Sequence, residues 1–268
     1  MIIISLIIIL IILNIINILY VSTYNSNINL LKDIYENNYN PKIKTSILIS
    51  GQIRNNFFPC LLSQKIFLYD PLNTDIFAVF SDDISNEMKQ KIVNILKPKS
   101  ILWFKDNKKL YQNKKFPNAF LMYEKMFLCN NLRKEYQKIN NIVYDINIRI
   151  RPDLIIKNYI PNYVINNINQ NTIYSPYINN IDFITNIFNL GISDQLFIGD
   201  NNSINIISDI FTHIKDDNPR ISEIYLKKYI NRVNVNINYF NIRFIISKLT
   251  SENINIFYII YYLLCFIL

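Results

Sequence analysis

Short β-branched segments alternate with helix-forming segments between residues 44 and 156, and this order constrains the fold more than any other feature of the sequence. The expected elements are strands at 44–51, 74–81, 100–104 and 141–156, and helices at 85–96 and 118–139. Strands that alternate with helices in this way predict an α/β fold with a mostly parallel central sheet flanked by helices. In such sheets ligands bind beyond the carboxyl ends of the strands, so functional residues are expected in the polar loops there.

The two ends of the chain are apolar. Residues 1–21 contain an uncharged run of about 20 residues, which is long enough to cross a ~30 Å hydrocarbon layer as a helix, so a transmembrane anchor is expected there and a cleavable signal peptide is the alternative. Residues 22–44 are polar and predict a stem, and residues 45–250 form the expected globular domain. The apolar segment at 251–268 is too short to span comfortably, so packing on the core or an interfacial position is expected.

The net charge of +8 favours an acidic partner, such as a phosphorylated substrate or an anionic surface. The lysines are scattered, and no basic run interleaved with aromatic residues occurs, so nucleic acid is not an expected partner. The single histidine and the three widely spaced cysteines match no metal-ligand or disulfide pattern.

The segment YDINIRIRPDL carries polar residues at every second position, which places them on one face of a strand. Unpaired buried charge is costly, so one end of this row is expected to open into a polar cleft, where arginine would grip phosphate oxygens. Pro152 lacks an amide hydrogen and predicts the end of regular strand pairing. The alternative is an internal ladder of ion pairs that only stabilises the sheet. The row consists of Asp145, Asn147, Arg149, Arg151 and Asp153.

The loop SGQIR follows the first expected strand and is a second candidate site. Gly51 permits a close backbone approach, Gln52 suits a base or ribose, and Arg54 suits phosphate. The loop lacks the GxGxxG and GxxxxGK spacings, so neither NAD binding nor ATP hydrolysis is indicated. An ordinary turn with a solvated arginine is the alternative.

Two carboxylates further along the chain are candidates for proton transfer. Asp194, in the segment GISDQLFIGD, is placed in a turn where it could deprotonate an acceptor hydroxyl, although Ser193 and Asp194 are also good caps for a following helix. Glu223 stands near the start of an expected amphipathic helix, where it faces the cleft or complements the helix dipole.

Seven of these pieces, taken in order over residues 45–232, resemble a family of GT-A-like glycosyltransferases of large DNA viruses, algae and bacterial surface-polysaccharide loci, including WavE-like proteins. The matching segments are SGQIR, NTDIFAVFS, KPKSILWF, FLMYEKMF, YDINIRIRPDL, SDQLFIGD and PRISEIYLKKYI. The resemblance implies a GT-A-like fold and a transferase that moves a sugar from a nucleotide-diphosphate donor to a glycan or glycoprotein acceptor. With the anchor, it implies a single-pass, type II-like membrane protein whose domain is lumenal or associated with a viral factory.

The resemblance also implies roles for individual residues, because the segment RxRPD stands where related enzymes carry a metal-binding DxD motif. Here Arg151 replaces the first aspartate, so either a divalent cation (Mn²⁺ or Mg²⁺) at Asp153 or the basic side chains themselves would neutralise the leaving diphosphate. The alternatives are a non-catalytic GT-A-like protein that binds glycan or a partner, and a structural membrane protein. The implied roles are metal or diphosphate ligand for Asp153, anion contacts for Arg149 and Arg151, nucleotide loop for Ser50, Gly51, Gln52 and Arg54, and catalytic base for Asp194.

Overall fold

The computed structural model describes residues 42–54, 57–111, 117–176, 192–214, 222–242 and 244–246. The strands are β1 (Thr45–Gly51), β2 (Asp75–Ser81), β3 (Ser100–Phe104), β4 (Ile146–Ile150), β5 (Leu154–Ile156), β6 (Thr172–Pro176), β7 (Leu196–Gly199), β8 (Asn236–Phe240) and β9 (Phe244–Ile246). The helices are α2 (Phe57–Gln64), η1 (Lys65–Tyr69), α3 (Asn86–Leu96), η2 (Lys108–Tyr111), α4 (Pro117–Asn140), α5 (Asn162–Asn166), α7 (Asn201–Ser208), α8 (Ile210–Ile214) and α9 (Ser222–Arg232).

The described residues form a seven-stranded sheet in the order β3-β2-β1-β4-β7-β6-β8. β1 pairs in parallel with both β2 and β4, β2 pairs in parallel with β3, and β6 pairs in parallel with β8. β7 is antiparallel to both of its neighbours, β4 and β6. All strands of this sheet except β7 therefore run in one direction, which confirms the expected mostly parallel sheet.

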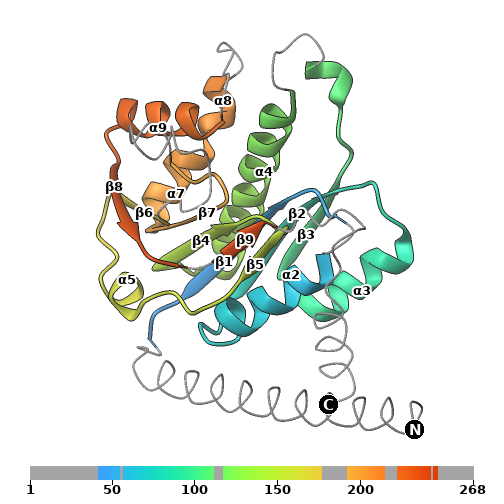
Figure 1. Ribbon diagram of the computed structural model, residues 1–268, viewed down its shortest axis with the longest axis horizontal. Coiled ribbons are helices and arrows are strands. Elements are labelled where there is room, and N and C mark those ends of the chain that lie inside the picture. Colours follow the sequence, from blue (N-terminus) through green and yellow to red (C-terminus); the bar gives the residue numbers. More distant parts are fainter. Residues whose placement is uncertain are drawn as a thin grey trace, which may run out of the picture. The chain divides into compact units, whose positions relative to one another are not determined.

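The connections between the first four strands place a topological switch between β1 and β4. From β1 the chain moves outward to β2 and β3, and it then returns through α4 to pair β4 with the opposite side of β1. Figure 1 shows α2 and α3 on one face of the sheet and α4 with α7 on the other. A crevice opens at the carboxyl ends of two strands whose connections leave in opposite directions, so this is where a ligand site is expected.

The helix boundaries follow from local chemistry. The side chain of Ser85 accepts a hydrogen bond from the amide of Met88 and caps α3, as the sequence predicts. α3 ends at Lys97, which has a φ of 46° and directly precedes Pro98, so the helix cannot continue. The longest expected helix, at 118–139, is confirmed as α4, which packs across β1, β2 and β3.

The strand expected at 141–156 is interrupted. β4 ends at Ile150, and β5 joins β9 in a separate two-stranded antiparallel sheet. The prediction that regular pairing stops at Pro152 is therefore confirmed, because a residue without an amide hydrogen cannot continue the ladder. The turn formed by residues 151–153 places its side chains at the switch point.

The alternative interpretation of Ser193 and Asp194 as helix caps is wrong. They precede β7, a fully buried strand, and α7 begins only after Asp200. The Asp200 carboxylate accepts from the amides of Asn202 and Ser203 and is the cap of that helix. Asp194 is thus left free for another role.

Three expected segments lie outside the described residues. These are the transmembrane anchor at 1–21, most of the stem at 22–44 and the apolar segment at 251–268. Within the part of the chain that the structure describes, no helix has both the length and the apolar character needed to cross a membrane.

Candidate functional site

A cavity of about 680 Å³ opens at the carboxyl ends of β1 and β4, at the switch point. The sequence-predicted residues that line it are Ser50, Gly51, Gln52, Arg54, Arg151, Asp153 and Asp194. They come from three stretches of the chain that lie more than 40 residues apart, and the fold brings them together around one cavity. Their individual roles stay predictions.

Gly51 allows the ends of β1 and β4 to approach one another. Its φ is +153°, a conformation that residues with a side chain rarely adopt. A Cβ atom added to Gly51 would lie 2.8 Å from Cδ of Pro152. The close packing of these two residues places the SGQIR loop directly against the RPD turn.

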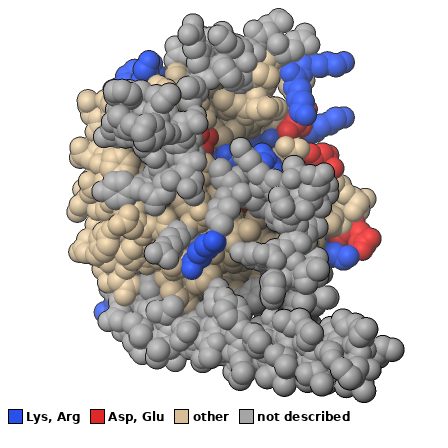
Figure 2. All heavy atoms as spheres, viewed as in Figure 1, with Lys and Arg blue, Asp and Glu red and all other residues tan. Residues whose placement is uncertain are grey.

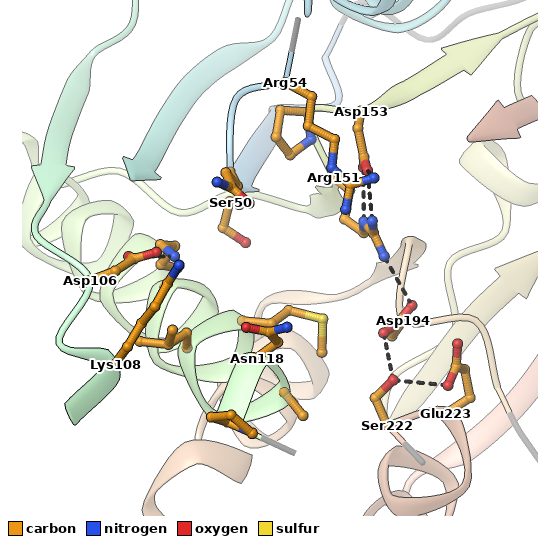
Figure 3. A pocket seen from close by; sticks show the side chains of 18 residues that line it. Ser50, Arg54, Asp106, Lys108, Asn118, Arg151, Asp153, Asp194, Ser222 and Glu223 are labelled. Atoms are coloured by element: carbon orange, nitrogen blue, oxygen red, sulfur yellow. Dashed lines mark hydrogen bonds and ion pairs between the residues drawn. The ribbon is translucent and has the colours of Figure 1, made fainter. Parts of the chain in front are cut away.

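A guanidinium cluster occupies one side of the cavity (Figure 3). Arg151 donates to both carboxylate oxygens of Asp153, over 2.9 and 2.7 Å, and Arg54 lies 3.4 Å from the same carboxylate. Burial lowers the pKa of Arg151, but the hydrogen bond and the negative charge of Asp153 outweigh burial and leave that pKa raised. Arg151 therefore carries its charge at the cavity. Arg54 is 44% exposed and has the longer contact, so it is free to reorient toward an anion.

A pair of carboxylates extends this wall on the other side of Arg151. Nη1 of Arg151 lies 3.9 Å from Oδ1 of Asp194, and the Ser222 hydroxyl contacts both Asp194 and Glu223. Burial raises the pKa of Glu223, and the charge of Asp194 raises it further. Oδ1 of Asp194 is buried and has no hydrogen-bond partner within the described residues, so it is available to a ligand hydroxyl.

A lysine and an aspartate form the facing wall. Lys125 extends from α4 and makes an ion pair with Asp106, which follows β3, with Nζ 2.6 Å from Oδ1. Ser81, at the end of β2, donates to the other carboxylate oxygen over 3.0 Å. The Lys125 side chain is only 4% exposed, and burying such an ammonium group without a partner would be costly.

Sequence reasoning missed several lining residues. Asp106, Lys108, Lys125 and Ser222 were not singled out, and Glu223 was singled out with its two roles left open. Lys125 had a detectable signal, since it is the one cation inside the apolar stretch FLMYEKMF. The loop position of Asp106 after a predicted strand was a second signal.

Two of the predicted site residues, Gln52 and Arg149, are not simply exposed to a ligand in the cavity. Gln52 lines the cavity and donates to Asp83 over 2.8 Å, so its amide is oriented by the loop that follows β2. Arg149 does not line the cavity; it is 1% exposed in β4 and lies with its guanidinium 5.7 Å from the ring centroid of Phe197. Burial lowers the pKa of Arg149 to about 10, while the charge of Asp194 opposes that shift. The predicted anion contact of Arg149 is therefore not made from the lining of the cavity, and its charge instead interacts with the buried Asp194.

Cationic and acidic residues line the cavity in equal number. Among the described residues its lining holds four cationic and four acidic side chains, with Arg149 buried beside them. On the face shown in Figure 2, basic and acidic side chains lie close to one another, mostly in its upper right part. Binding of an anion therefore depends on the placement of individual groups within the cavity.

The arrangement at Asp153 does not fit a divalent cation. Both of its oxygens accept from Arg151, and a cation there would lie beside two guanidinium groups. Within the described ranges, no cluster of three or more His, Cys, Asp or Glu side chains is arranged to hold a metal ion. Arg54 and Arg151 are instead placed to supply positive charge to a phosphorylated ligand.

No known protein family and no curated protein matches the sequence. Several solved structures are similar in backbone at low identity. The galactosyltransferase LgtC, solved with donor and acceptor sugar analogues, is 8% identical with a TM-score of 0.43, covering 73% of each chain. A nucleotide-diphospho-sugar transferase assigned in Desulfovibrio desulfuricans G20 is 11% identical with a TM-score of 0.39, covering 74% of this chain and 80% of that one. The glycosyltransferase GlyE of Streptococcus pneumoniae TIGR4 is 9% identical with a TM-score of 0.41, and the match covers 74% of this chain but 45% of GlyE.

Proposed function

We propose that this protein is a glycosyltransferase that moves a sugar from a nucleotide-diphosphate donor to a glycan or glycoprotein acceptor. One observation carries the proposal. Two guanidinium groups and a carboxylate with an unpartnered oxygen face the same cavity, at the switch point of a mostly parallel sheet. The sequence resemblance to GT-A-like glycosyltransferases points to the same reaction.

The donor diphosphate is assigned to the guanidinium cluster. Arg54 and Arg151 present planar forks of N–H donors, which match phosphate oxygens in bidentate geometry. Asp153 holds Arg151 in place before the donor arrives, with contacts of 2.9 and 2.7 Å. The hydroxyl oxygen of Ser50 is buried in the cavity and has no hydrogen-bond partner among the described residues, and with Gln52 it is placed for the nucleoside.

The acceptor is assigned to Asp194. In the transfer, the acceptor oxygen forms a bond to the anomeric carbon, the bond from that carbon to the diphosphate oxygen breaks, and the electron pair leaves with the nucleoside diphosphate. The acceptor proton passes to Oδ1 of Asp194, the buried oxygen that has no hydrogen-bond partner among the described residues. The two arginines stabilise the charge that develops on the leaving group, which is the largest contribution expected of such a site.

We also propose that the chain is anchored in a membrane by residues 1–21, which would bring the domain to a membrane-associated acceptor. The support is the uncharged run of about 20 residues in the sequence. The full-length protein is expected to stay with membranes during extraction with alkaline carbonate. Release into the supernatant would contradict the anchor without affecting the proposed reaction.

The reaction is tested by incubating the full-length protein with UDP-, GDP- and CMP-sugars, with EDTA or with Mn²⁺. Release of nucleoside diphosphate from a UDP- or GDP-sugar is expected in EDTA, while CMP-sugars, which lack a diphosphate, are not turned over. Arg151→Ala is expected to lower kcat by about 10²- to 10³-fold, the usual effect of losing one charge-stabilising donor. Asp194→Asn is expected to lower transfer by about 10²- to 10⁴-fold.

The matched control is Arg232→Ala, which removes an arginine of α9 that lies against Tyr229 and does not line the cavity. Equal turnover by Arg151→Ala, Asp153→Ala and Arg232→Ala would reject the assigned site. Tight binding of a nucleoside diphosphate without turnover of any donor would favour the non-catalytic alternative.

A further inference from the structure

Two carboxylates of the cavity converge on one hydroxyl group (Figure 3). Oγ of Ser222 lies 2.9 Å from Oδ2 of Asp194 and 2.8 Å from Oε2 of Glu223. Both distances are typical of O–H···O hydrogen bonds. The three side chains come from the turn before β7 and from the first turn of α9, which are brought together by the tertiary fold.

The number of hydrogen atoms available for these two contacts decides whether one of the carboxyl groups is protonated. A serine hydroxyl has one hydrogen, and an ionised carboxylate only accepts hydrogen bonds. Two ionised carboxylates would therefore compete for the single hydrogen of Ser222. One of the two short contacts would then bring an oxygen of Ser222 and a carboxylate oxygen together with no hydrogen between them. Both contacts are satisfied only when one of the two carboxyl groups carries a proton and donates it to Oγ of Ser222.

The surroundings favour Glu223 as the protonated group. Oδ1 of Asp194 lies 3.9 Å from Nη1 of Arg151, and the buried Arg149 guanidinium also interacts with this carboxyl group. The groups that face Glu223 are Asp194, Arg151 and Tyr123 of α4, with Lys227 one turn further along α9. For Glu223 the burial and the charge of Asp194 outweigh Arg151, and its pKa is raised.

We infer that Glu223 carries the proton of this pair of carboxyl groups and donates it to Ser222, whose hydroxyl in turn donates to Oδ2 of Asp194. This chain leaves Oδ1 of Asp194, which lies 3.9 Å from Nη1 of Arg151, without a hydrogen-bond partner among the described residues. Ser222 and Glu223 are then positioning residues, and Asp194 is the group that receives the acceptor proton. The last statement rests on the proposed glycosyltransferase function, whereas the proton on Glu223 does not.

Protonation of Glu223 is tested without any substrate, by the thermal unfolding of the full-length protein across pH. A carboxyl group whose pKa is higher in the folded than in the unfolded state stabilises the fold fully below the unfolded pKa. That contribution is lost as the pH rises through the folded pKa. The Tm of Glu223→Gln is therefore expected to rise relative to wild type above about pH 4.5, by roughly 3–5 °C for each unit of pKa shift.

The matched control is Glu135→Gln, which changes an exposed glutamate of α4. Its Tm difference from wild type is expected to be flat over the same range. A flat difference for Glu223→Gln as well would show that Glu223 ionises like a surface glutamate and would overturn the inference.

The positioning role is tested by the pH profile of donor turnover. Glutamine keeps an N–H donor toward Ser222, so Glu223→Gln is expected to retain most of the kcat and to lose the decline at high pH that ionisation of Glu223 causes. Glu223→Ala and Ser222→Ala leave Asp194 without this support, and a loss of roughly 5- to 150-fold in kcat is expected. A merely structural role would lower Tm in these variants and leave the pH profile unchanged, which would contradict the inference.

The glycosyltransferase proposal and the inference of a protonated Glu223 can be rejected independently of one another. If no donor is turned over by the wild type, the glycosyltransferase proposal is wrong, and the Tm series still decides whether Glu223 carries a proton. If donors are turned over but Glu223→Gln shows no Tm trend, the reaction stands and the proton chain is rejected.

Discussion

Replacement of Gly51 by alanine is expected to destabilise the protein more than any other glycine-to-alanine change in the described residues. At a φ of +153° an alanine is strained, by about 1–3 kcal/mol for a residue in a sparsely populated conformation. The new Cβ would also lie 2.8 Å from Cδ of Pro152, well inside an ordinary carbon contact. The proline ring cannot rotate away, so a further ~1–3 kcal/mol of overpacking is expected.

Gly199→Ala is the matched control. Its Cβ would meet Cδ1 of Ile173 at 2.7 Å, which is also too close, but this atom is the end of a flexible side chain, and the backbone of Gly199 has no positive φ. Only the overpacking contribution of ~1–3 kcal/mol is therefore expected for this variant. The difference between the two variants measures the backbone strain at Gly51 together with the greater rigidity of Pro152.

Urea denaturation of the full-length proteins, followed by far-UV circular dichroism, measures both free energies of unfolding. Gly51→Ala is expected to lose roughly 2–6 kcal/mol, a large share of the 5–15 kcal/mol typical of a domain. It should also weaken nucleoside-diphosphate binding, because a displaced Pro152 moves the neighbouring Arg151 and Asp153. The reasoning is refuted if Gly51→Ala is as stable as Gly199→Ala at an unchanged m-value.

Three further predictions follow from the buried and charged groups. Arg133 is 0% exposed and donates to asparagines of α4, β4 and α7. The Arg133→Met protein is therefore expected to be less stable than wild type by about 3 kcal/mol or more. A free energy of unfolding in urea equal to that of wild type would contradict this. Arg151→Asp places a second carboxylate beside Asp153, so UDP binding measured by calorimetry should become dependent on Mn²⁺. Binding of UDP by this variant in EDTA would contradict the assignment of the diphosphate to the guanidinium group of Arg151. Burial raises the pKa of the Cys129 thiol. Alkylation of Cys129, mapped by mass spectrometry, should therefore require denaturant. Alkylation of Cys129 in the folded protein would show that α4 opens.

Much of the fold was predictable because its determinants are local. The first three strands, α3 with its Ser85 cap, α4 and the end of β4 before Pro152 all followed from periodicity, capping and proline chemistry over fewer than 25 residues each. The alternative that Ser193 and Asp194 cap a helix was wrong for a related reason. A serine and an aspartate favour a helix start locally, but the next four residues form a fully buried strand between β4 and β6.

The candidate site was predictable only in part. Residues that follow strands could be placed at the carboxyl edge of the sheet, so Gly51, Arg54, Arg151 and Asp153 were expected near each other. The position of Arg149 was not, because alternation assigns a face of the strand but not the depth of burial. Arg151 at the cavity is only two residues from Arg149, which is buried against Phe197 of β7.

The sequence by itself determined the strand and helix order, the mostly parallel sheet and the edge at which polar side chains gather, since each depends on neighbours a few residues away. Only the tertiary structure decided which polar groups meet. Ser222 is 28 residues from Asp194, and Lys125 reaches Asp106 from a different element. Such contacts form because α4 packs against the sheet and α9 contacts α4, which buries these side chains together, and buried polar groups then require one another as partners.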